Sequence, residues 1–209
     1  MDAVLFIHGR SGNALEADRY RVLFPDYAVF GLDYHGRTPR DAGKEIHAAV
    51  RTLKLRYERV VLVAVSIGAF FSLHGELDRL IEKAFFISPV TDMEGLICAM
   101  MAAEGVSETE LQSRGEIPTS FGEPLSWEYL SYVRTHPVSW TVPTAILCGS
   151  ADTLVPVEAT ETFAKATGAS LTVMDGGEHW FHTEAQLAFL DRWIERETGL
   201  HGSGTQEEK

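Results

Sequence analysis

An apolar run at residues 59–71, RVVLVAVSIGAFF, constrains the fold of this chain more than any other feature. Its centre is Ser66, which stands between small residues in the pentapeptide AVSIG and is followed at once by a second apolar segment. This order predicts a strand, a tight turn and a helix, with the serine hydroxyl held clear of the backbone. A serine after a strand is also a common helix N-cap, so the pentapeptide alone leaves both interpretations open.

Six short apolar runs rich in Val, Ile, Leu and Phe predict the strands of the core. They lie at residues 3–7, 27–32, 60–65, 84–87, 144–148 and 170–174. None alternates cleanly between apolar and polar residues, which is typical of strands buried on both faces of a parallel sheet. Helical patterns fall between them, opening at Thr38-Pro39, covering residues 157–167 and beginning again at Thr183. The alternation predicts a doubly wound α/β fold with a mostly parallel sheet of about six strands.

One long segment interrupts this alternation. Residues 91–142 are too long for a simple connection and contain two helical stretches, 96–103 and 127–133, joined by a polar bridge. We expect this insertion to form a helical cap over the carboxyl edge of the sheet. The predicted organisation is therefore one domain at residues 1–198 with a cap at 91–142, followed by a disordered polar tail at 199–209.

Composition and charge argue against several kinds of partner. The 209 residues, 45% of them hydrophobic, suffice for one domain with a sizeable core. The net charge of −12, without any basic cluster, argues against nucleic acid and anionic membranes, and no apolar stretch is long enough to span a bilayer. Cys98 and Cys148 show no disulfide or metal spacing, so buried packing is expected for both. The first residues resemble a core strand rather than a signal peptide, which favours a cytoplasmic location.

Polar residues follow most of the predicted strands, where ligands bind in open α/β sheets. In chain order these are His8-Gly9-Arg10, Asp33, His35, Ser66, Asp152 and His179. A serine, an acid and a histidine therefore follow one another at strand ends. This is the chain order that nucleophilic catalysis on such a sheet uses.

The chemistry of these residue types fits that order. A serine hydroxyl is a poor nucleophile at neutral pH and needs an adjacent base, a role for which His179 is suited. Asp152 would hold the imidazole in one tautomer and stabilise the imidazolium. Asp152 could instead only shape its turn, in which case Asp33 is the second choice, and His182 competes with His179 as the base.

Four motifs in order resemble a small serine hydrolase of the α/β-hydrolase fold. They are the turn His8-Gly9, the pentapeptide AVSIG, the acid-bearing loop GSADTLVP and the histidine-bearing loop GGEHWFH, and the resemblance covers residues 3–197. Two features depart from the family pattern. Ala64 replaces the first glycine of the pentapeptide, and the first predicted strand begins almost at the N-terminus, so we expect a minimal sheet without the early strands of larger members.

The resemblance implies an esterase-like enzyme with Ser66 as nucleophile, His179 as base and Asp152 as acid. It also implies an oxyanion hole made by the backbone N–H groups of Arg10 and Ile67. The substrate would be a small ester-like molecule whose acyl group lies in an apolar pocket of the cap. No cofactor and no metal are expected, because no nucleotide-binding glycine pattern or metal-ligand spacing is present. A peptidase, a thioesterase and a non-catalytic binding protein on the same fold remain alternatives.

Overall fold

The computed structural model describes residues 1–199, and a six-stranded parallel sheet forms its centre. The strands follow the spatial order β2-β1-β3-β4-β7-β8, with every neighbouring pair parallel. They are β1 (Asp2–Ile7), β2 (Tyr27–Leu32), β3 (Val60–Val65), β4 (Lys83–Ile87), β7 (Thr144–Gly149) and β8 (Ser170–Met174). Each agrees with a predicted strand to within one residue at either end, so the predicted α/β class is confirmed.

Helices cover both faces of this sheet, and two separate apolar clusters fill the layers between. One cluster joins the sheet to α1, α2 and α6, and the other joins it to η1 and α7. These helices are η1 (Ala14–Val22), α1 (Pro39–Lys54), α2 (Ile67–Leu73), α6 (Val157–Thr167) and α7 (Glu184–Thr198). The inner strands β1, β3, β4 and β7 are buried on both faces, so they appear in the sequence as continuous apolar runs.

The helix ends follow from local capping. Thr38 begins α1 by accepting a hydrogen bond from the amide of Asp41 at 3.1 Å, and Thr183 forms a capping box with Gln186 at the start of α7. The 3-10 helix η1 is not predicted by the pattern. Only two of its residues, Ala17 and Tyr20, are buried, so it has no apolar stripe to reveal it.

The order of the strands places a topological switch point at the carboxyl ends of β1 and β3. The strands β2 and β3 lie on opposite sides of β1, so the direction of winding reverses there. Ligands bind at such a switch point in open α/β sheets. The turn that begins at His8 follows β1, and Ser66 follows β3, so both lie at this switch point.

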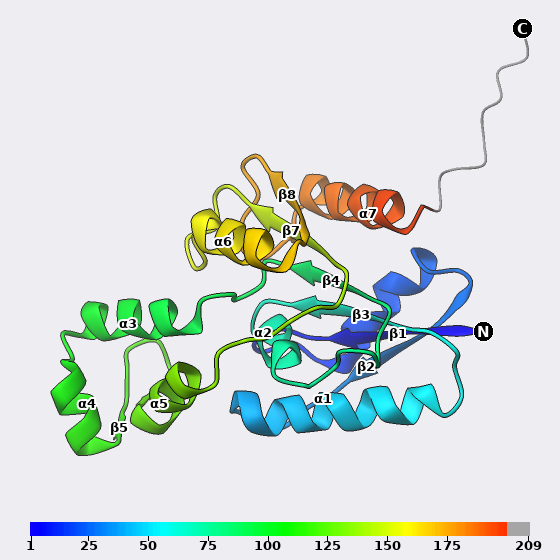
Figure 1. Ribbon diagram of the computed structural model, residues 1–209. Coiled ribbons are helices and arrows are strands. Elements are labelled where there is room, and N and C mark those ends of the chain that lie inside the picture. Colours follow the sequence, from blue (N-terminus) through cyan, green and yellow to red (C-terminus); the bar gives the residue numbers. More distant parts are fainter. Residues whose placement is uncertain (200–209) are drawn as a thin grey trace, which may run out of the picture.

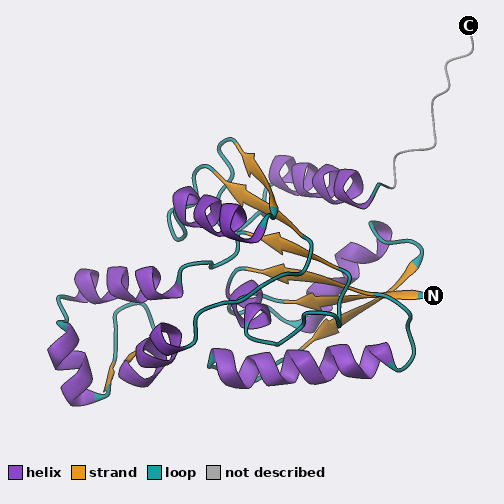
Figure 2. Ribbon diagram, in the orientation of Figure 1, coloured by secondary structure: helices purple, strands orange, loops and turns teal. Residues whose placement is uncertain are grey.

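The insertion between β4 and β7, residues 91–142, is the segment that the sequence predicts as a cap. Its elements are α3 (Met93–Glu104), α4 (Glu108–Arg114), α5 (Trp127–Thr135) and a short antiparallel pair, β5 (Glu116–Ile117) and β6 (Leu125–Ser126). Figures 1 and 2 show the cap helices beyond the arrowheads of the sheet strands, at the carboxyl edge. The predicted helices are right in kind, but α3 begins earlier because Asp92 caps it, and the predicted polar bridge contains α4.

Apolar side chains attach the cap to the face of the sheet that α2 covers. A single buried cluster contains core residues of the sheet together with Met93, Ile97, Met101, Leu111 and Leu130 of the cap. Where the chain leaves the cap, Trp140 packs against Phe86 of β4, with 5.6 Å between ring centroids. These side chains hold the cap against the sheet domain.

Three further expectations concern the cysteines, membranes and the tail. Cys148 is buried as expected, but Cys98 is exposed, because Ile97 and Met101 occupy the inward face of α3. Among the helices of residues 1–199, none has the length and apolar content needed to cross a bilayer. The predicted tail at 199–209 lies, apart from Gly199, outside the described residues.

Candidate active site

The carboxyl edge of the sheet brings Ser66, Asp152 and His179 together. Ser66 follows β3, Asp152 lies in the loop after β7, and His179 lies in the loop after β8. The Oγ atom of Ser66 is 2.8 Å from Nε2 of His179, and Nδ1 of His179 is 2.7 Å from Oδ2 of Asp152. The three residues that the sequence singled out thus form one hydrogen-bonded chain.

Ser66 has a backbone conformation that few residues other than glycine adopt, with φ 53° and ψ −121°. Its amide donates to the carbonyl of Ile87 at 3.0 Å, and its carbonyl accepts from Ala69 at 3.1 Å and Val90 at 3.2 Å. These bonds hold the turn against its intrinsic strain. The Ser66 side chain makes no N-cap hydrogen bond to α2, so the helix-cap interpretation is wrong.

Small residues around this turn allow backbones to approach closely. A Cβ atom on Gly68 would lie 2.3 Å from the carbonyl oxygen of His8, so only glycine lets α2 pack against the end of β1 here. A Cβ atom on Gly9 would lie 3.3 Å from Cβ of Ser66, which places the turn after β1 directly beside the serine. Ala64 is completely buried within β3, and the core accommodates its methyl group.

Asp152 is fixed through both carboxylate oxygens. While Oδ2 faces His179, Oδ1 accepts hydrogen bonds from the amides of Leu154 at 2.8 Å and Val155 at 2.9 Å. Burial alone would raise the pKa of Asp152, but the hydrogen bonds from His179, Val155 and Leu154 outweigh it and lower the pKa. An ionised carboxylate at this position requires the proton of a neutral imidazole to sit on Nδ1. Nε2 is then free to accept the hydroxyl proton of Ser66.

The loops that carry the acid and the histidine are locked together by glycine contacts. A Cβ atom on Gly149 would lie 2.0 Å from the carbonyl oxygen of Gly177, so the two loops touch through their backbones. The amide of Ala151 also donates to the Gly177 carbonyl at 2.8 Å, and the amide of Ser150 donates to Met174 at 2.9 Å. This contact sets the separation between Asp152 and His179.

The competing candidates have other partners. Asp33 accepts a hydrogen bond from the amide of Ala14 at 2.6 Å. His182 has its Nδ1 atom 2.7 Å from the carbonyl oxygen of Trp180, at the start of α7. Neither Asp33 nor His182 is hydrogen-bonded to Ser66, His179 or Asp152 in the way those three are bonded to one another. Within residues 1–199, no cluster of three or more His, Cys, Asp or Glu side chains could hold a metal ion.

The oxyanion hole predicted from the backbone amides of Arg10 and Ile67 stays a prediction, and both residues belong to the two turns that meet at Ser66. Ile67 is the first residue of α2, so its N–H is a helix-terminal donor without an intrahelical partner. Arg10 follows Gly9 in the turn beside Ser66. The guanidinium of Arg10 forms an ion pair with Glu123 of the cap, which the sequence did not indicate.

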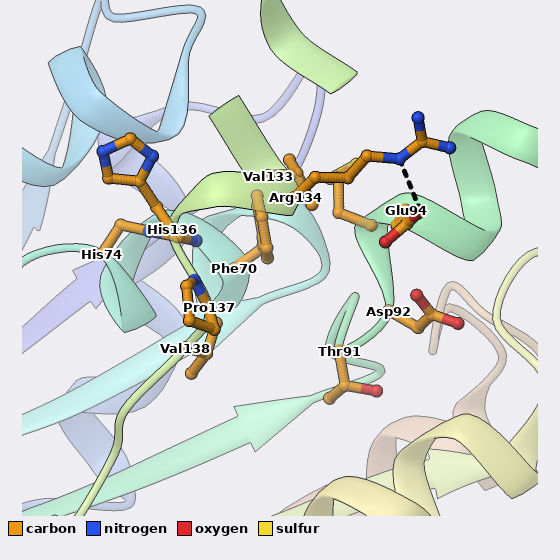
Figure 3. A pocket seen from close by; sticks show the side chains of 11 residues that line it. Phe70, His74, Thr91, Asp92, Glu94, Val133, Arg134, His136, Pro137 and Val138 are labelled. Atoms are coloured by element: carbon orange, nitrogen blue, oxygen red, sulfur yellow. Dashed lines mark hydrogen bonds and ion pairs between the residues drawn. The ribbon is translucent and has the colours of Figure 1, made fainter. Parts of the chain in front are cut away.

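A hollow of about 260 Å³ lies at the junction of the cap and the sheet domain, and Ser66 is not among the residues that line it. It is walled by the end of α2 and by the segments that enter and leave the cap (Figure 3). Arg134 donates to Glu94 at 2.7 Å beside the hollow, as the dashed line in Figure 3 marks. Burial, together with the charge of His136, lowers the pKa of His74 to about 4. This hollow is not the acyl pocket predicted over Ser66, which stays a prediction.

Comparison with known proteins gives both a sequence family and structural relatives. Residues 4–192 match the Alpha/beta hydrolase family, whereas no curated protein matches the chain in sequence. Est1E from Butyrivibrio proteoclasticus is similar with a TM-score of 0.78 and 17% identity, over 97% of this chain and 89% of that chain. Alpha/beta hydrolase domain-containing protein 10 from mouse is similar with a TM-score of 0.72 and 18% identity, over 95% and 90%. An esterase from Pyrococcus furiosus gives a TM-score of 0.62 and 19% identity, over 95% and 80%. At these identities the structural likeness concerns the fold.

Proposed function

Because this chain belongs to the alpha/beta hydrolase family, we propose that it is a serine hydrolase that cleaves a small carboxylic ester. The observation that carries the proposal is the hydrogen-bonded chain from Ser66 through His179 to Asp152. The strained turn at Ser66 supports it further, because strain of this kind persists only where the surrounding structure enforces it. The proposed substrate is a small uncharged molecule, and no cofactor is needed for the reaction.

The first half of the proposed reaction forms an acyl-enzyme. Ser66 Oγ attacks the carbonyl carbon of the ester while His179 Nε2 takes the hydroxyl proton. Asp152 stabilises the resulting imidazolium through Nδ1. The N–H groups of Arg10 and Ile67 donate to the oxyanion of the tetrahedral intermediate. His179 then gives the proton to the leaving alcohol, which departs as the Ser66 ester forms.

The second half returns the enzyme to its starting state. Water attacks the acyl carbon, and His179 takes one of its protons as general base. The tetrahedral intermediate uses the same two N–H groups, and its collapse breaks the bond to Ser66 Oγ. The imidazolium of His179 returns the proton to that oxygen. One ester and one water thus give one carboxylic acid and one alcohol.

The experiment that tests this proposal is covalent labelling combined with turnover. A fluorophosphonate probe should label the wild-type protein on Ser66, and p-nitrophenyl acetate and butanoate should be hydrolysed. Ser66→Ala should abolish labelling and reduce kcat/KM by roughly 10⁴ or more, by analogy with the removal of a triad member. Ser170→Ala is the matched control, because Ser170 is exposed at the amino end of β8, at the opposite edge of the sheet.

Two outcomes would contradict the proposal. Labelling that persists in Ser66→Ala would show that another residue is the nucleophile. A wild-type protein that is neither labelled nor active on esters would show that the hydrogen-bonded chain has no catalytic role. A parallel assay with a thioester and a peptide amide of the same acyl group tests the two related hydrolase activities.

A further inference from the structure

The hydroxyl of Tyr129 is a polar group for which the proposed reaction has no use. Tyr129 lies in the first turn of α5, in the cap. Its oxygen is buried, yet it has no hydrogen-bond partner within residues 1–199. Buried polar groups in native proteins almost always have a partner, and an unpaired one destabilises the fold. The Tyr129 hydroxyl would therefore be satisfied by a hydrogen-bond acceptor from a bound molecule.

The cap segment around Tyr129 faces the turn that follows β1. Glu123, earlier in the same segment, forms an ion pair with Arg10 of that turn. Ser126 then caps α5 by accepting a hydrogen bond from the amide of Tyr129 at 3.2 Å. Tyr129 and Ile67, the residue directly after the serine, both pack against the same apolar cluster, and Arg10 and Tyr34 act electrostatically on the Tyr129 hydroxyl. Tyr129 thus belongs to the part of the cap that adjoins the proposed oxyanion hole.

On the other side of this contact, Tyr34 already has its partners. Its ring stacks on the ring of His8 at 4.4 Å, and its hydroxyl donates to the His8 carbonyl at 3.1 Å. His8 precedes Gly9, which lies against Ser66. Two tyrosines therefore approach the turn beside the serine, one with a satisfied hydroxyl and one without.

The charges around Tyr129 determine the protonation state of its hydroxyl and the kind of acceptor that the hydroxyl can bind. Burial raises the pKa of Tyr129, and the neighbouring Tyr34 raises it further, while Arg10 lowers it in part. The phenol is therefore protonated at neutral pH and can donate a hydrogen bond. Arg10 is the neighbouring cation, and its charge is balanced by Glu123. Because Glu123 neutralises Arg10, this pair leaves no net positive charge to attract an anion, so an uncharged oxygen is the better acceptor.

We propose that the Tyr129 hydroxyl donates a hydrogen bond to an uncharged oxygen on the acyl group of the substrate. The preferred ester then carries an oxo or ether oxygen in its acyl chain, and a plain alkyl chain leaves the hydroxyl unpaired. This inference rests on the proposed function, because it needs an acyl group held at Ser66. The acyl pocket expected from the sequence would then be apolar apart from one hydrogen-bond donor, the Tyr129 hydroxyl.

Pairs of p-nitrophenyl esters that differ only by one oxygen test this inference. The first pair is 4-oxopentanoate against pentanoate, and the second is methoxyacetate against butanoate. The measurement is kcat/KM for each ester with the wild type, with Tyr129→Phe and with Tyr132→Phe. Tyr132 is the matched control because it lies on the same helix, where its ring stacks on His136. Comparing variants within each pair cancels the intrinsic reactivity of the esters.

We expect Tyr129→Phe to lower kcat/KM about tenfold for an oxygen-bearing ester and less than about twofold for its alkyl partner. Tyr132→Phe should change neither. The melting temperature of Tyr129→Phe should be equal to or above that of the wild type, because the lost hydroxyl has no partner. A purely structural role for this hydroxyl would instead lower the melting temperature and affect all esters alike.

The outcomes separate this inference from the proposed function. If the wild type hydrolyses esters and labels on Ser66, but Tyr129→Phe changes both members of each pair equally, only the inference on Tyr129 fails. If the wild type hydrolyses no ester and is not labelled, the proposed function fails with it. A preference for p-nitrophenyl hemisuccinate that Arg10→Ala removes would overturn the choice of an uncharged acceptor.

Discussion

The loops at the ends of β3, β7 and β8 and the cap hold their polar side chains in different ways. In those loops, Ser66, His179 and Asp152 each have a partner at 2.7 or 2.8 Å, and both carboxylate oxygens of Asp152 are bonded. Backbone bonds fix the turn at Ser66, and glycine contacts fix the two loops. These groups are preorganised before any ligand arrives.

In the cap and its junction with the sheet domain, several polar atoms are buried without a partner. They are Oη of Tyr129, Oγ1 of Thr91 and Nε2 of His74. An exposed ion pair between Arg10 and Glu123 links the cap to the turn beside Ser66. We infer from this difference that the two regions have different roles. In the proposed reaction, the groups that perform the chemistry have their partners in the loops of the sheet, whereas the Tyr129 hydroxyl, proposed to select the substrate, has none in the cap.

The largest expected effect tests the sheet-domain side of this comparison. His179→Ala should reduce kcat/KM by roughly 10⁴ or more for every ester, because the general base and the imidazolium are lost together. The triple variant Ser66→Ala, Asp152→Ala, His179→Ala should be little worse than the single variant. His182→Ala is the control and should retain near-normal turnover. Effects that add up across the three positions would contradict their action as one unit.

A smaller effect is expected at Arg10, where the two regions meet. Arg10→Pro removes the backbone N–H and should lower kcat by roughly 10²–10³, the usual loss for one oxyanion donor. Arg10→Ala keeps that N–H and should retain most activity towards p-nitrophenyl acetate. Circular dichroism establishes that both variants are folded. Equal damage from the two substitutions would show that the guanidinium, rather than the amide, acts in the reaction.

The sheet and the residues at its edge could be predicted from the sequence for a local reason. Inner strands buried on both faces leave continuous apolar runs, and Ser66 and Asp152 each lie in the segment directly after such a run, whereas His179 follows the shorter apolar run of the edge strand β8. Chain order was then enough to choose Asp152 over Asp33, which the structure places elsewhere, bonded to Ala14. Neither the prediction of the strands nor the choice of Asp152 required knowledge of how distant segments pack.

The cap could be predicted only in outline, because its details depend on contacts between distant segments. The pattern indicated two helices, but the capping of α3 by Asp92 and the presence of α4 were missed. The ion pair between Arg10 and Glu123 joins residues from different regions and has no local signal. Tyr129 lies in the predicted helical stretch 127–133, and nothing in the sequence singles it out. Its unpaired hydroxyl appears only once the neighbours in space are known.

The third prediction concerns stability at the junction of the two regions. Burial lowers the pKa of His74 from 6.5 to about 4, so the unfolded chain binds more protons than the folded one between these pH values. The free energy of unfolding should therefore fall as the pH is lowered from 6.5 to 4. His74→Phe should flatten this fall in urea denaturation, whereas the exposed His35→Gln should not. An unchanged slope in His74→Phe would show that His74 is not held neutral by the fold.

The smallest expected effect is on the link between the regions. Glu123→Gln removes the partner of Arg10, but both side chains are nearly half exposed, at 44% and 49%. Exposed ion pairs contribute less than about 1 kcal/mol, so the melting temperature should change by less than about 4 °C. Activity on p-nitrophenyl acetate should stay within about twofold of wild type, since the Arg10 amide is untouched. Turnover of p-nitrophenyl hemisuccinate should rise, because a negative charge near the acyl group is gone, and added salt should reduce that gain.

Glu128→Gln, at an exposed position of α5, is the control. A large loss on the neutral ester would mean that the cap holds the turn beside Ser66 in its active geometry, and the proposed separation between chemistry and selection would not hold.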